Sequence, residues 1–509
     1  MSPGTVTAMG RVGAFCLVLH SHLPWLAHHG RWPVGEEWLY QAWAHAYLPV
    51  LDVVRRLAAE GRRDLLTLGV TPVLAAQLDD PHSLRGVHDW LGGWLLRAHG
   101  AAPRLPDLAA REHRLATGAL QVFERDWRHG ASPLLRGLAD AGAIELLGGP
   151  AMHPFAPLLL PEVRAFALET GLVDTAIRLG ARPAGIWAPE CGYGPGMEHE
   201  YAAAGVRRFL VDGPALHGDT ALARPVGTSD VLAFGRDLDV TYRVWSPRSG
   251  YPGGRDYRDF HTFDHPSGLK PARVTGLGVE PEHKSPYAPD RAAAAVARDA
   301  ADFVSVVRER LLGVRERLGR PGLTVAAFDT ELFGHWWHEG PAWLEAVLRA
   351  LPAAGVHVTT LRGAVDAGLV GEPVEVPPSS WGSGKDWRVW AGDQVADLVA
   401  LNERVQKALL DATGRAAGAT RDPVRDALAQ QALLALSSDW AFMVSKDSAA
   451  GYARDRAHCH AERVEELAGL LAAGQERPAA HLVAGWGAMD SVFGHVDARL
   501  LAPPRVTHR

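Results

Sequence analysis

The chain has 509 residues, of which 47% are hydrophobic and 22% are charged. This composition excludes wholesale disorder, and the length exceeds what a single hydrophobic core usually supports. The net charge is −6 and no basic block occurs along the chain, so nucleic acid and an anionic membrane are poor candidates for partners.

The N-terminal part and the cysteines indicate the compartment. The first apolar run, AFCLVL at 14–19, is too short to span a bilayer and leads directly into HSHLP. The three cysteines, Cys16, Cys191 and Cys459, form no CxxC pair. We therefore interpret 14–19 as the first core strand and expect a cytoplasmic protein.

Short apolar runs recur along the chain, and each is followed by His, Pro, Asp or Glu. Continuous apolar runs of this length are typical of parallel strands that are covered on both faces. Polar residues that follow such strands are what a β/α barrel presents at its active face. The runs are AFCLVL (14–19), LLTLGV (65–70), AIELLG (143–148), GIWAP (185–189), RFLVD (208–212) and LTVAAFD (323–329).

Three segments depart from this rhythm. Residues 78–138 have helical patterns and predict a helical insertion between the second and third strands. Residues 227–290 are rich in Gly, Pro, Tyr and Arg, which predicts a functional loop region. From about 395, apolar residues recur at three-to-four spacing. We predict a catalytic domain at 1–394, which includes the insertion and the loop region, and an all-helical domain at 395–509.

Three histidines follow predicted strands. HSHLP places His20 and His22 on one face, because alternate residues of a strand share a face. The pair could bind a metal, or could hydrogen-bond a substrate or a neighbouring carboxylate. Neither an HExxH motif nor a cysteine cluster supports the metal. His153, in LGGPAMHPFAPLL, follows a third strand, and three such histidines together indicate a site.

Two segments offer carboxylates at strand ends. In GIWAPECGYGPG, Glu190 follows a short strand, as a nucleophile does in many sugar enzymes. In FDTELFGHWW, Asp329 and Glu331 lie only two residues apart, so both would approach a substrate from the same side. Glycoside cleavage needs carboxyl groups that flank the bond, and Glu190 is therefore the better partner for one of them.

Five segments occur in the order of the five motifs of glycoside hydrolase family 57, which the chain resembles over nearly its whole length. They are HSHLP, ELLGGPAMHPFAPLL, IWAPECGY, AAFDTELFGHWW and SSDWAF (437–442). The family comprises α-glucan-active amylases, 4-α-glucanotransferases and 1,4-α-glucan branching enzymes, and the chain is most similar to the branching enzymes. The resemblance implies an α/β fold with an incomplete, TIM-like (β/α)7 barrel. It also implies a retaining mechanism without a metal or another cofactor.

The resemblance implies roles for the three carboxylates. Glu190 matches the nucleophile that attacks the anomeric carbon of an α-1,4 linkage. Asp329 matches the acid/base, which protonates the leaving oxygen and later deprotonates a glucan 6-hydroxyl to form an α-1,6 branch. Glu331 matches no catalytic role, and we expect it to hydrogen-bond the backbone of its own motif or His335.

The implied substrate is an α-1,4-glucan such as amylose or a glycogen-like polymer, handled by a monomer or a small homo-oligomer. Tyr251, in GYPG, matches the tyrosine at the tip of a flexible loop over the site, and Tyr257 is a weaker candidate. Two departures bear on acceptor preference: GLKPAR (268–273) lacks an aromatic residue, and Ser448 stands where glutamine is common. The other predicted substrate-binding residues are His20, His22, His153, Trp187, Arg273, His335, Trp381, Trp390 and Asp439.

Three alternatives stay open at this point. A 4-α-glucanotransferase or an α-amylase would use the same motifs. A zinc-dependent carbohydrate hydrolase or deacetylase would use His20 and His22 as metal ligands. A non-catalytic glucan-binding protein is disfavoured by the intact pair of Glu190 and Asp329.

Overall fold

The computed structural model describes residues 12–246, 249–414 and 420–501. The predicted domains also include residues 1–11, 247–248, 415–419 and 502–509, which lie outside the described residues.

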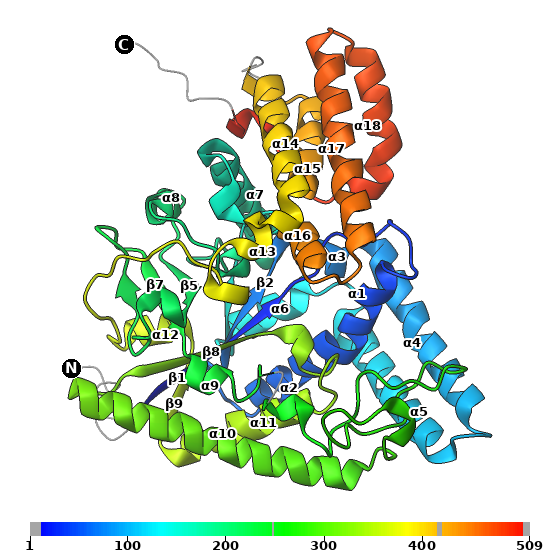
Figure 1. The fold of residues 1–509 in the computed structure, drawn as a ribbon, viewed down its shortest axis with the longest axis vertical. Helices are drawn as coiled ribbons and strands as arrows, with labels where there is room; N and C mark the ends of the chain where they lie inside the picture. The colour runs from blue at the N-terminus through cyan, green and yellow to red at the C-terminus, as the bar shows by residue number, and fades with distance from the viewer. Residues whose placement is uncertain (1–11, 247–248, 415–419, 502–509) are drawn as a thin grey trace.

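Parallel strands in two sheets form the centre of the molecule (Figure 1). The first sheet has the order β3 (Ile144–Leu147), β2 (Leu66–Val70), β1 (Gly13–Ser21) and β8 (Leu323–Asp329), and β9 (Val356–Thr359) pairs with the start of β1. The second has the order β4 (Gly185–Ile186), β5 (Arg208–Asp212), β7 (Leu232–Arg236) and β6 (Arg224–Pro225), of which only β6 is antiparallel to its neighbour.

Backbone contacts join the sheets at two places. Gly148, directly after β3, forms a parallel bridge to Ile186 of β4. The N–H of Asp237, directly after β7, donates to the carbonyl of Val325 in β8 over 2.8 Å. Because the joined strands run in the same direction, the residues that follow β1, β4 and β8 gather at one end of the sheets.

The six predicted strands are confirmed, and burial explains why they are apolar throughout. All nine residues of β1 are buried, and helix α10 (Pro289–Leu318) covers them from one side, where Phe303 meets Phe15 at 5.9 Å between ring centroids. Residues 232–236 fall in the predicted loop region 227–290 but form strand β7, so that part of the prediction is wrong. The run VLAF is itself apolar and mostly buried, as is typical of a parallel strand.

Helices lie between β2 and β3, where the insertion is predicted. They are α3 (Pro72–Asp79), α4 (Pro81–Ala101), α5 (Pro106–Val122) and α6 (Ser132–Asp140). Proline stands in the first turn of each, where its missing N–H costs no helical hydrogen bond. In addition, Asp80 caps α4 by accepting from the N–H of Ser83 over 2.8 Å. Figure 1 shows α4 and α5 side by side, away from the strands.

The C-terminal region is helical, as predicted. Its helices are α14 (Ala396–Gly414), α15 (Pro423–Ala435), α16 (Ser438–Ser445), α17 (Ala450–Ala472) and α18 (Glu476–Asp490). Their apolar residues share one core with Phe155 and with Phe166 of α7 (Pro161–Leu179). This shared core holds α16 close to the strands, at the base of the helical group in Figure 1.

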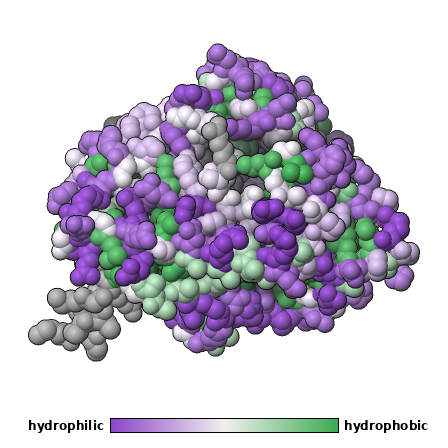
Figure 2. Space-filling model, turned by 60° about the horizontal axis from the view of Figure 1, so that its bottom comes forward, coloured by the Kyte–Doolittle hydropathy of each residue, from purple (hydrophilic) through white to green (hydrophobic). Residues whose placement is uncertain are grey.

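No helix among the described residues is long and apolar enough to cross a membrane. On the face drawn in Figure 2, hydrophilic residues predominate and hydrophobic residues occur in small groups.

Candidate active site

A cavity of about 530 Å³ lies where the ends of β1 and β8 and the turn after β4 meet α16. Eleven of the side chains discussed from the sequence line it, although they come from segments far apart in the chain. They are His20, His22, His153, Glu190, Asp329, Glu331, His335, Trp381, Trp390, Asp439 and Ser448.

Glu190 stands in the tight turn Pro189–Cys191 after β4, with a left-handed backbone (φ +61°) that is uncommon for a residue other than glycine. Its carboxylate is buried and accepts one hydrogen bond on each oxygen. Trp381 Nε1 donates over 2.8 Å and Ser438 Oγ donates over 2.8 Å. Burial raises the pKa of Glu190, while these two hydrogen bonds act in the opposite direction. The result is a fixed and poorly solvated carboxylate.

Asp329 is the last residue of β8 and pairs in register with His20 of β1. Burial, followed by the negative charges of Glu331 and Glu190, raises the pKa of Asp329 well above its ordinary value. Arg236 opposes this shift without cancelling it. The cavity therefore holds two carboxyl groups with different surroundings: Glu190 accepts two hydrogen bonds, and Asp329 faces negative neighbours.

Glu331 has more hydrogen-bond partners than the sequence predicts. Of the two expected partners, the backbone of its own motif, at Glu331 itself, bonds the carboxylate, and His335 does not. The carboxylate also accepts from the hydroxyl of Tyr47 and, over 3.1 Å, from the backbone N–H of His22. Tyr47 reaches it from the π-helical turn Trp43–Tyr47, which no sequence pattern indicates. Burial raises the pKa of Glu331 to about 7. Glu331 thus ties the loop after β1 to the end of β8.

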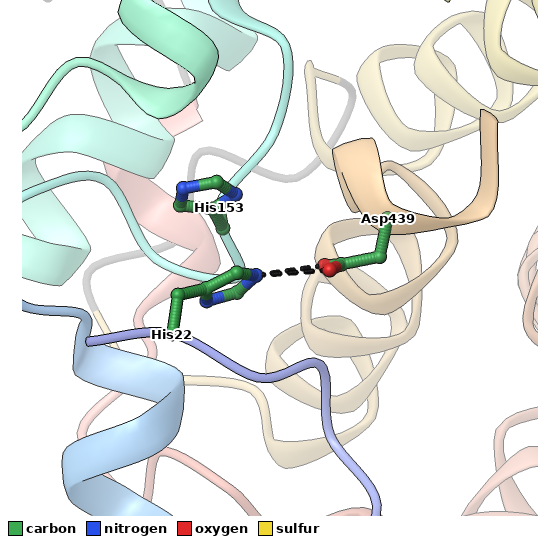
Figure 3. A group of neighbouring side chains, drawn as sticks. All are labelled: His22, His153 and Asp439. Atoms are coloured by element: carbon green, nitrogen blue, oxygen red, sulfur yellow. Dashed lines mark hydrogen bonds and ion pairs between the residues drawn. The ribbon is translucent and has the colours of Figure 1, made fainter. Parts of the chain in front are cut away.

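His22 and His153 lie together next to Asp439 of α16 (Figure 3), and His20 stacks on His153 at 5.1 Å. The rings of His22 and His153 lie 3.7 Å apart at 19°, and His22 Nε2 is 2.9 Å from Asp439 Oδ2. Burial alone would lower the pKa of His22, but the charge and hydrogen bond of Asp439 raise it. Burial lowers the pKa of His20 and of His153 well below the usual value. Of the three rings, the pair with Asp439 therefore favours the protonated form of His22 alone.

Nitrogen and oxygen atoms of His22, His153 and Asp439 lie within 4.8 Å of one another, as metal ligands would. Each of these residues is also satisfied by a protein partner. His22 Nδ1 lies 3.0 Å from Thr71 Oγ1, and His153 Nδ1 lies 3.0 Å from Ser438 Oγ. A metal ion would have to displace the hydrogen bond between His22 and Asp439, because that bond already uses His22 Nε2 and both carboxylate oxygens of Asp439.

Three predicted tryptophans surround the carboxylates in different ways. Trp381 lines the cavity with its N–H on Glu190. Trp390 lines it too, but is fixed by a stack on Phe155 at 4.6 Å and 9°. Trp187 is fully buried and does not line the cavity. It stacks on His20 at 4.3 Å and 10°, so it positions that histidine rather than a sugar.

The structure does not bring Tyr251, Tyr257 or Arg273 to this cavity. The hydroxyl of Tyr251 donates to Asp302 of α10 over 2.5 Å, and that of the buried Tyr257 donates to Asp299 of the same helix over 2.6 Å. Arg273 donates to the carbonyl of Arg255 over 2.9 Å. These positions do not support the predicted contact of the three side chains with substrate.

Sequence reasoning missed other residues that line the cavity. Arg236 is the last residue of β7, the strand that the sequence did not predict. It pairs with Asp212 over 2.7 Å and lies over the ring of Trp381. Tyr242 and Trp245 also line the cavity and are 40% and 36% exposed. Both belong to the predicted loop region, in which the family resemblance indicates Tyr251 instead. Further lining residues that the sequence did not single out include Trp38, Lys385, Phe442 and Lys446.

Comparisons with known proteins agree with this arrangement. The model described as "Glycosyl hydrolase family 57" matches residues 16–366, and the model described as "1,4-alpha-glucan branching enzyme, C-terminal" matches residues 398–501. A probable 1,4-alpha-glucan branching enzyme of Mycobacterium tuberculosis is 60% identical over 96% of this chain and 98% of its own length.

Solved structures extend the comparison. A GH57-type branching enzyme from Pyrococcus horikoshii superposes with a TM-score of 0.92 at 28% identity, over 97% of each chain. The α-amylase AmyC from Thermotoga maritima superposes with a TM-score of 0.85 at 25% identity, over 97% of this chain and 99% of its own. With a family model matched over most of its length and a relative this similar from end to end, the chain belongs to glycosyl hydrolase family 57.

Proposed function

We propose that this protein is a retaining 1,4-α-glucan branching enzyme, which cleaves an α-1,4 linkage and transfers the chain to a 6-hydroxyl of a glycogen-like glucan. The observation that carries the proposal is the pair of carboxyl groups of the buried Glu190 and the half-buried Asp329, on different strand ends of one cavity. The similarity to a probable branching enzyme over both the catalytic and the C-terminal parts favours branching over the amylase and glucanotransferase alternatives.

In the first step, Glu190 attacks the anomeric carbon. The hydrogen bonds from Trp381 and Ser438 fix its oxygens and favour the ionised form that a nucleophile needs. Asp329, whose raised pKa favours the protonated form, gives its proton to the leaving glycosidic oxygen. The glycosidic bond breaks, and a bond forms between the anomeric carbon and Glu190.

In the second step, the 6-hydroxyl of an acceptor glucan takes the place of the leaving group. Asp329, now ionised, accepts the proton of this hydroxyl while its oxygen attacks the anomeric carbon and releases Glu190. Two displacements at one carbon retain its configuration. The apolar wall of Trp381, Trp245 and Phe442 limits the access of water, which would otherwise receive the chain.

We further propose that seven parallel strands, β1, β2, β3, β4, β5, β7 and β8, form the incomplete barrel implied by the family resemblance. The bridge from Gly148 to Ile186 and the hydrogen bond from Asp237 to Val325 support closure between the two sheets. The proposed boundary between the domains at 394 and 395 is consistent with the start of α14 at Ala396.

Incubation with amylose, followed by enzymatic debranching and chain-length analysis, tests the proposed function. We expect new α-1,6 linkages, seen as their anomeric proton signal in NMR spectra, and few new reducing ends. Longer linear chains without branches would indicate a glucanotransferase, and reducing ends alone would indicate an amylase. Activity that is lost with a chelator and restored by zinc would support the metal hydrolase instead, through His22, His153 and Asp439.

Tyr242 is the tyrosine of the loop region that we expect to control the choice between a sugar acceptor and water. It lines the cavity, it is 40% exposed, and its hydroxyl has no hydrogen-bond partner among the described residues. Tyr242→Ala should therefore lower the ratio of branching to hydrolysis on amylose, by about fivefold or more if one aromatic contact to the acceptor is lost.

Tyr251→Ala is the matched control, because Tyr251 comes from the same region but is bound to Asp302 outside the cavity. Equal ratios in the Tyr242 variant and the parent, or a larger drop in the Tyr251 variant, would contradict this assignment. The second outcome would restore the role predicted for Tyr251 from the sequence.

A further inference from the structure

The segment 379–385 lies against the turn that carries Glu190. Ser379 and Tyr193 exchange two backbone hydrogen bonds, over 3.0 and 3.1 Å, and form an antiparallel bridge. Two residues further on, the backbone N–H of Trp381 donates to the carbonyl of Glu190 over 2.8 Å, and its indole Nε1 donates to the carboxylate over 2.8 Å. Trp381 thus holds both the backbone and the side chain of Glu190, so its own position sets that of the carboxylate.

Lys385 closes this segment into a tight turn. Its backbone is left-handed (φ +62°), which is uncommon for a residue other than glycine, and its N–H donates to the carbonyl of Gly382 over 3.0 Å. The turn brings the side chain back to Trp381, whose carbonyl accepts from Lys385 Nζ over 3.1 Å. The same ammonium group lies 2.7 Å from Asp212 Oδ2. Lys385 therefore ties the backbone of Trp381 to Asp212.

Asp212 is the last residue of β5, and it is buried and does not line the catalytic cavity. Its second oxygen, Oδ1, accepts from Arg236 Nε over 2.7 Å. Arg236 in turn lies over the ring of Trp381, 5.3 Å from its centre. A carboxylate this deeply buried needs such cationic partners to stay ionised. Its two cations contact Trp381 at different places, Lys385 at the carbonyl and Arg236 at the ring.

We propose that the ion pair of Lys385 with Asp212 positions the nucleophile, because it holds Trp381 where the indole donates to Glu190. Lys385 is on this account a positioning residue that acts through Trp381. This inference rests on the proposed function, since it takes Glu190 as the nucleophile. If Trp381 moves, Glu190 keeps the donor Ser438 on one oxygen and loses the donor on the other. The carboxylate then becomes both less fixed and easier to protonate.

Glu190 also faces titratable groups from the other elements around the cavity, and replacing Lys385 leaves them in place. They include His22, His153, Arg236, Asp329, Glu331 and Asp439. A shift in the pKa of Glu190 on replacement of Lys385 would therefore come from the displacement of Trp381 or from the lost charge of Lys385 itself. A pair of variants with and without the indole N–H separates these two causes.

The test uses Lys385→Met, Trp381→Phe and the double variant. Methionine keeps a long unbranched side chain and removes the ammonium group, and phenylalanine keeps an aromatic ring and removes the N–H. The side chain of Lys385 is 28% exposed, so the change to methionine leaves no cavity in the core. Lys446→Met is the matched control, because Lys446 lines the same cavity and its Nζ donates over 2.6 Å to Ser383 of the same segment.

The first measurement is the indole N–H signal of Trp381 in NMR spectra of protein labelled with ¹⁵N-tryptophan. The signal is identified by its loss in Trp381→Phe. A hydrogen bond to a carboxylate moves such a signal downfield, so Lys385→Met should move it upfield and Lys446→Met should leave it in place. This measurement needs no turnover. An unmoved signal in Lys385→Met would overturn the inference.

The second measurement is the pH dependence of kcat/KM for amylose cleavage, whose acidic limb reports the ionisation of the nucleophile. Losing a hydrogen bond to the ionised form raises the pKa of Glu190, so the limb moves to higher pH. We expect a shift of about one pH unit in Lys385→Met and in Trp381→Phe, and no further shift in the double variant. Lys446→Met should keep the limb of the parent.

An equal shift on replacing Lys385 with and without the indole N–H would overturn the inference, because Lys385 would then act through its charge alone. Cleavage of amylose without new branches, together with the expected shifts, would overturn the proposed function. It would leave the positioning role of Lys385 standing, since that role concerns the cleavage step.

Discussion

Glu190→Gln is expected to lower kcat on amylose by about 10⁴-fold or more, because the amide cannot form the covalent bond to the anomeric carbon. The side chain keeps its volume, and its amide oxygen can still accept from Trp381 or Ser438. We therefore expect little change in the dissociation constant for maltooligosaccharides, measured by calorimetry. The loss would lie in the chemical step rather than in binding.

Glu198→Gln is the control for a glutamate in a similar setting. Glu198 is also buried and accepts from Tyr193 over 2.5 Å and from the N–H of Gly196 over 2.9 Å, but it does not line the catalytic cavity. This variant should keep most of the parent's kcat. Comparable activity of Glu190→Gln and Glu198→Gln would rule out Glu190 as the nucleophile.

The strands could be predicted because their residues are buried on both faces, which leaves a continuous apolar run in the sequence. AFCLVL and LTVAAFD are adjacent strands in the structure, in register from Ala14 with Leu323 to His20 with Asp329. The run VLAF has the same character, but the Gly- and Pro-rich residues of 227–290 around it predict irregular structure. Missing β7 also meant missing Arg236, which stands at its end and enters the cavity.

The choice of tyrosine shows where sequence reasoning ends. Tyr242 and Tyr251 lie nine positions apart in one irregular segment, and no periodicity tells which of them faces the cavity. That depends on tertiary contacts: Tyr251 is turned toward Asp302 of α10, whereas Tyr242 follows the short helix α9 (Leu238–Thr241) at the end of β7. The bond of Tyr47 to Glu331 joins residues 284 positions apart and leaves no local pattern at all.

Asp439 illustrates the opposite case. Local reasoning gives no cause to place an aspartate from a C-terminal helix beside His22, which is 417 positions away. The SSDW motif identified it only through the family resemblance. The structure adds the physical reason, since the core shared by the C-terminal helices and α7 holds α16 at the strand ends. It also adds Ser438, whose hydroxyl reaches Glu190 from the same turn.

Asp329→Asn should abolish branching and yet stabilise the folded protein at pH 8. The activity falls because the amide can neither protonate the leaving oxygen nor accept a proton from the 6-hydroxyl, and a loss of about 10²–10⁴-fold is expected. The stability rises because burial and the charges of Glu331 and Glu190 raise the pKa of Asp329 in the folded state. As the pH rises above the pKa that Asp329 has in the unfolded chain, Asp329 ionises more readily in the unfolded state than in the folded state. The parent protein therefore loses stability.

Asparagine does not ionise, so the Asp329→Asn variant does not lose stability in this way as the pH rises. The difference in Tm between Asp329→Asn and the parent should be small near pH 4 and should grow toward pH 8, as calorimetry or circular dichroism would show.

Asp439→Asn is the matched control, because Asp439 lines the same cavity but its pKa is shifted in the opposite direction. Burial would raise the pKa of Asp439, but the charge and hydrogen bond of His22 outweigh it and lower that pKa. The ionised Asp439 therefore stabilises the folded protein above the pKa that Asp439 has in the unfolded chain. This stabilisation is lost as the pH falls through the pKa of Asp439 in the folded state. Asp439→Asn should lower Tm at pH 7 and above, where Asp329→Asn raises it. Shifts of the same sign in both variants would contradict the assignment of Asp329 as the protonated acid, because only a carboxyl that resists ionisation gains stability when its charge is removed.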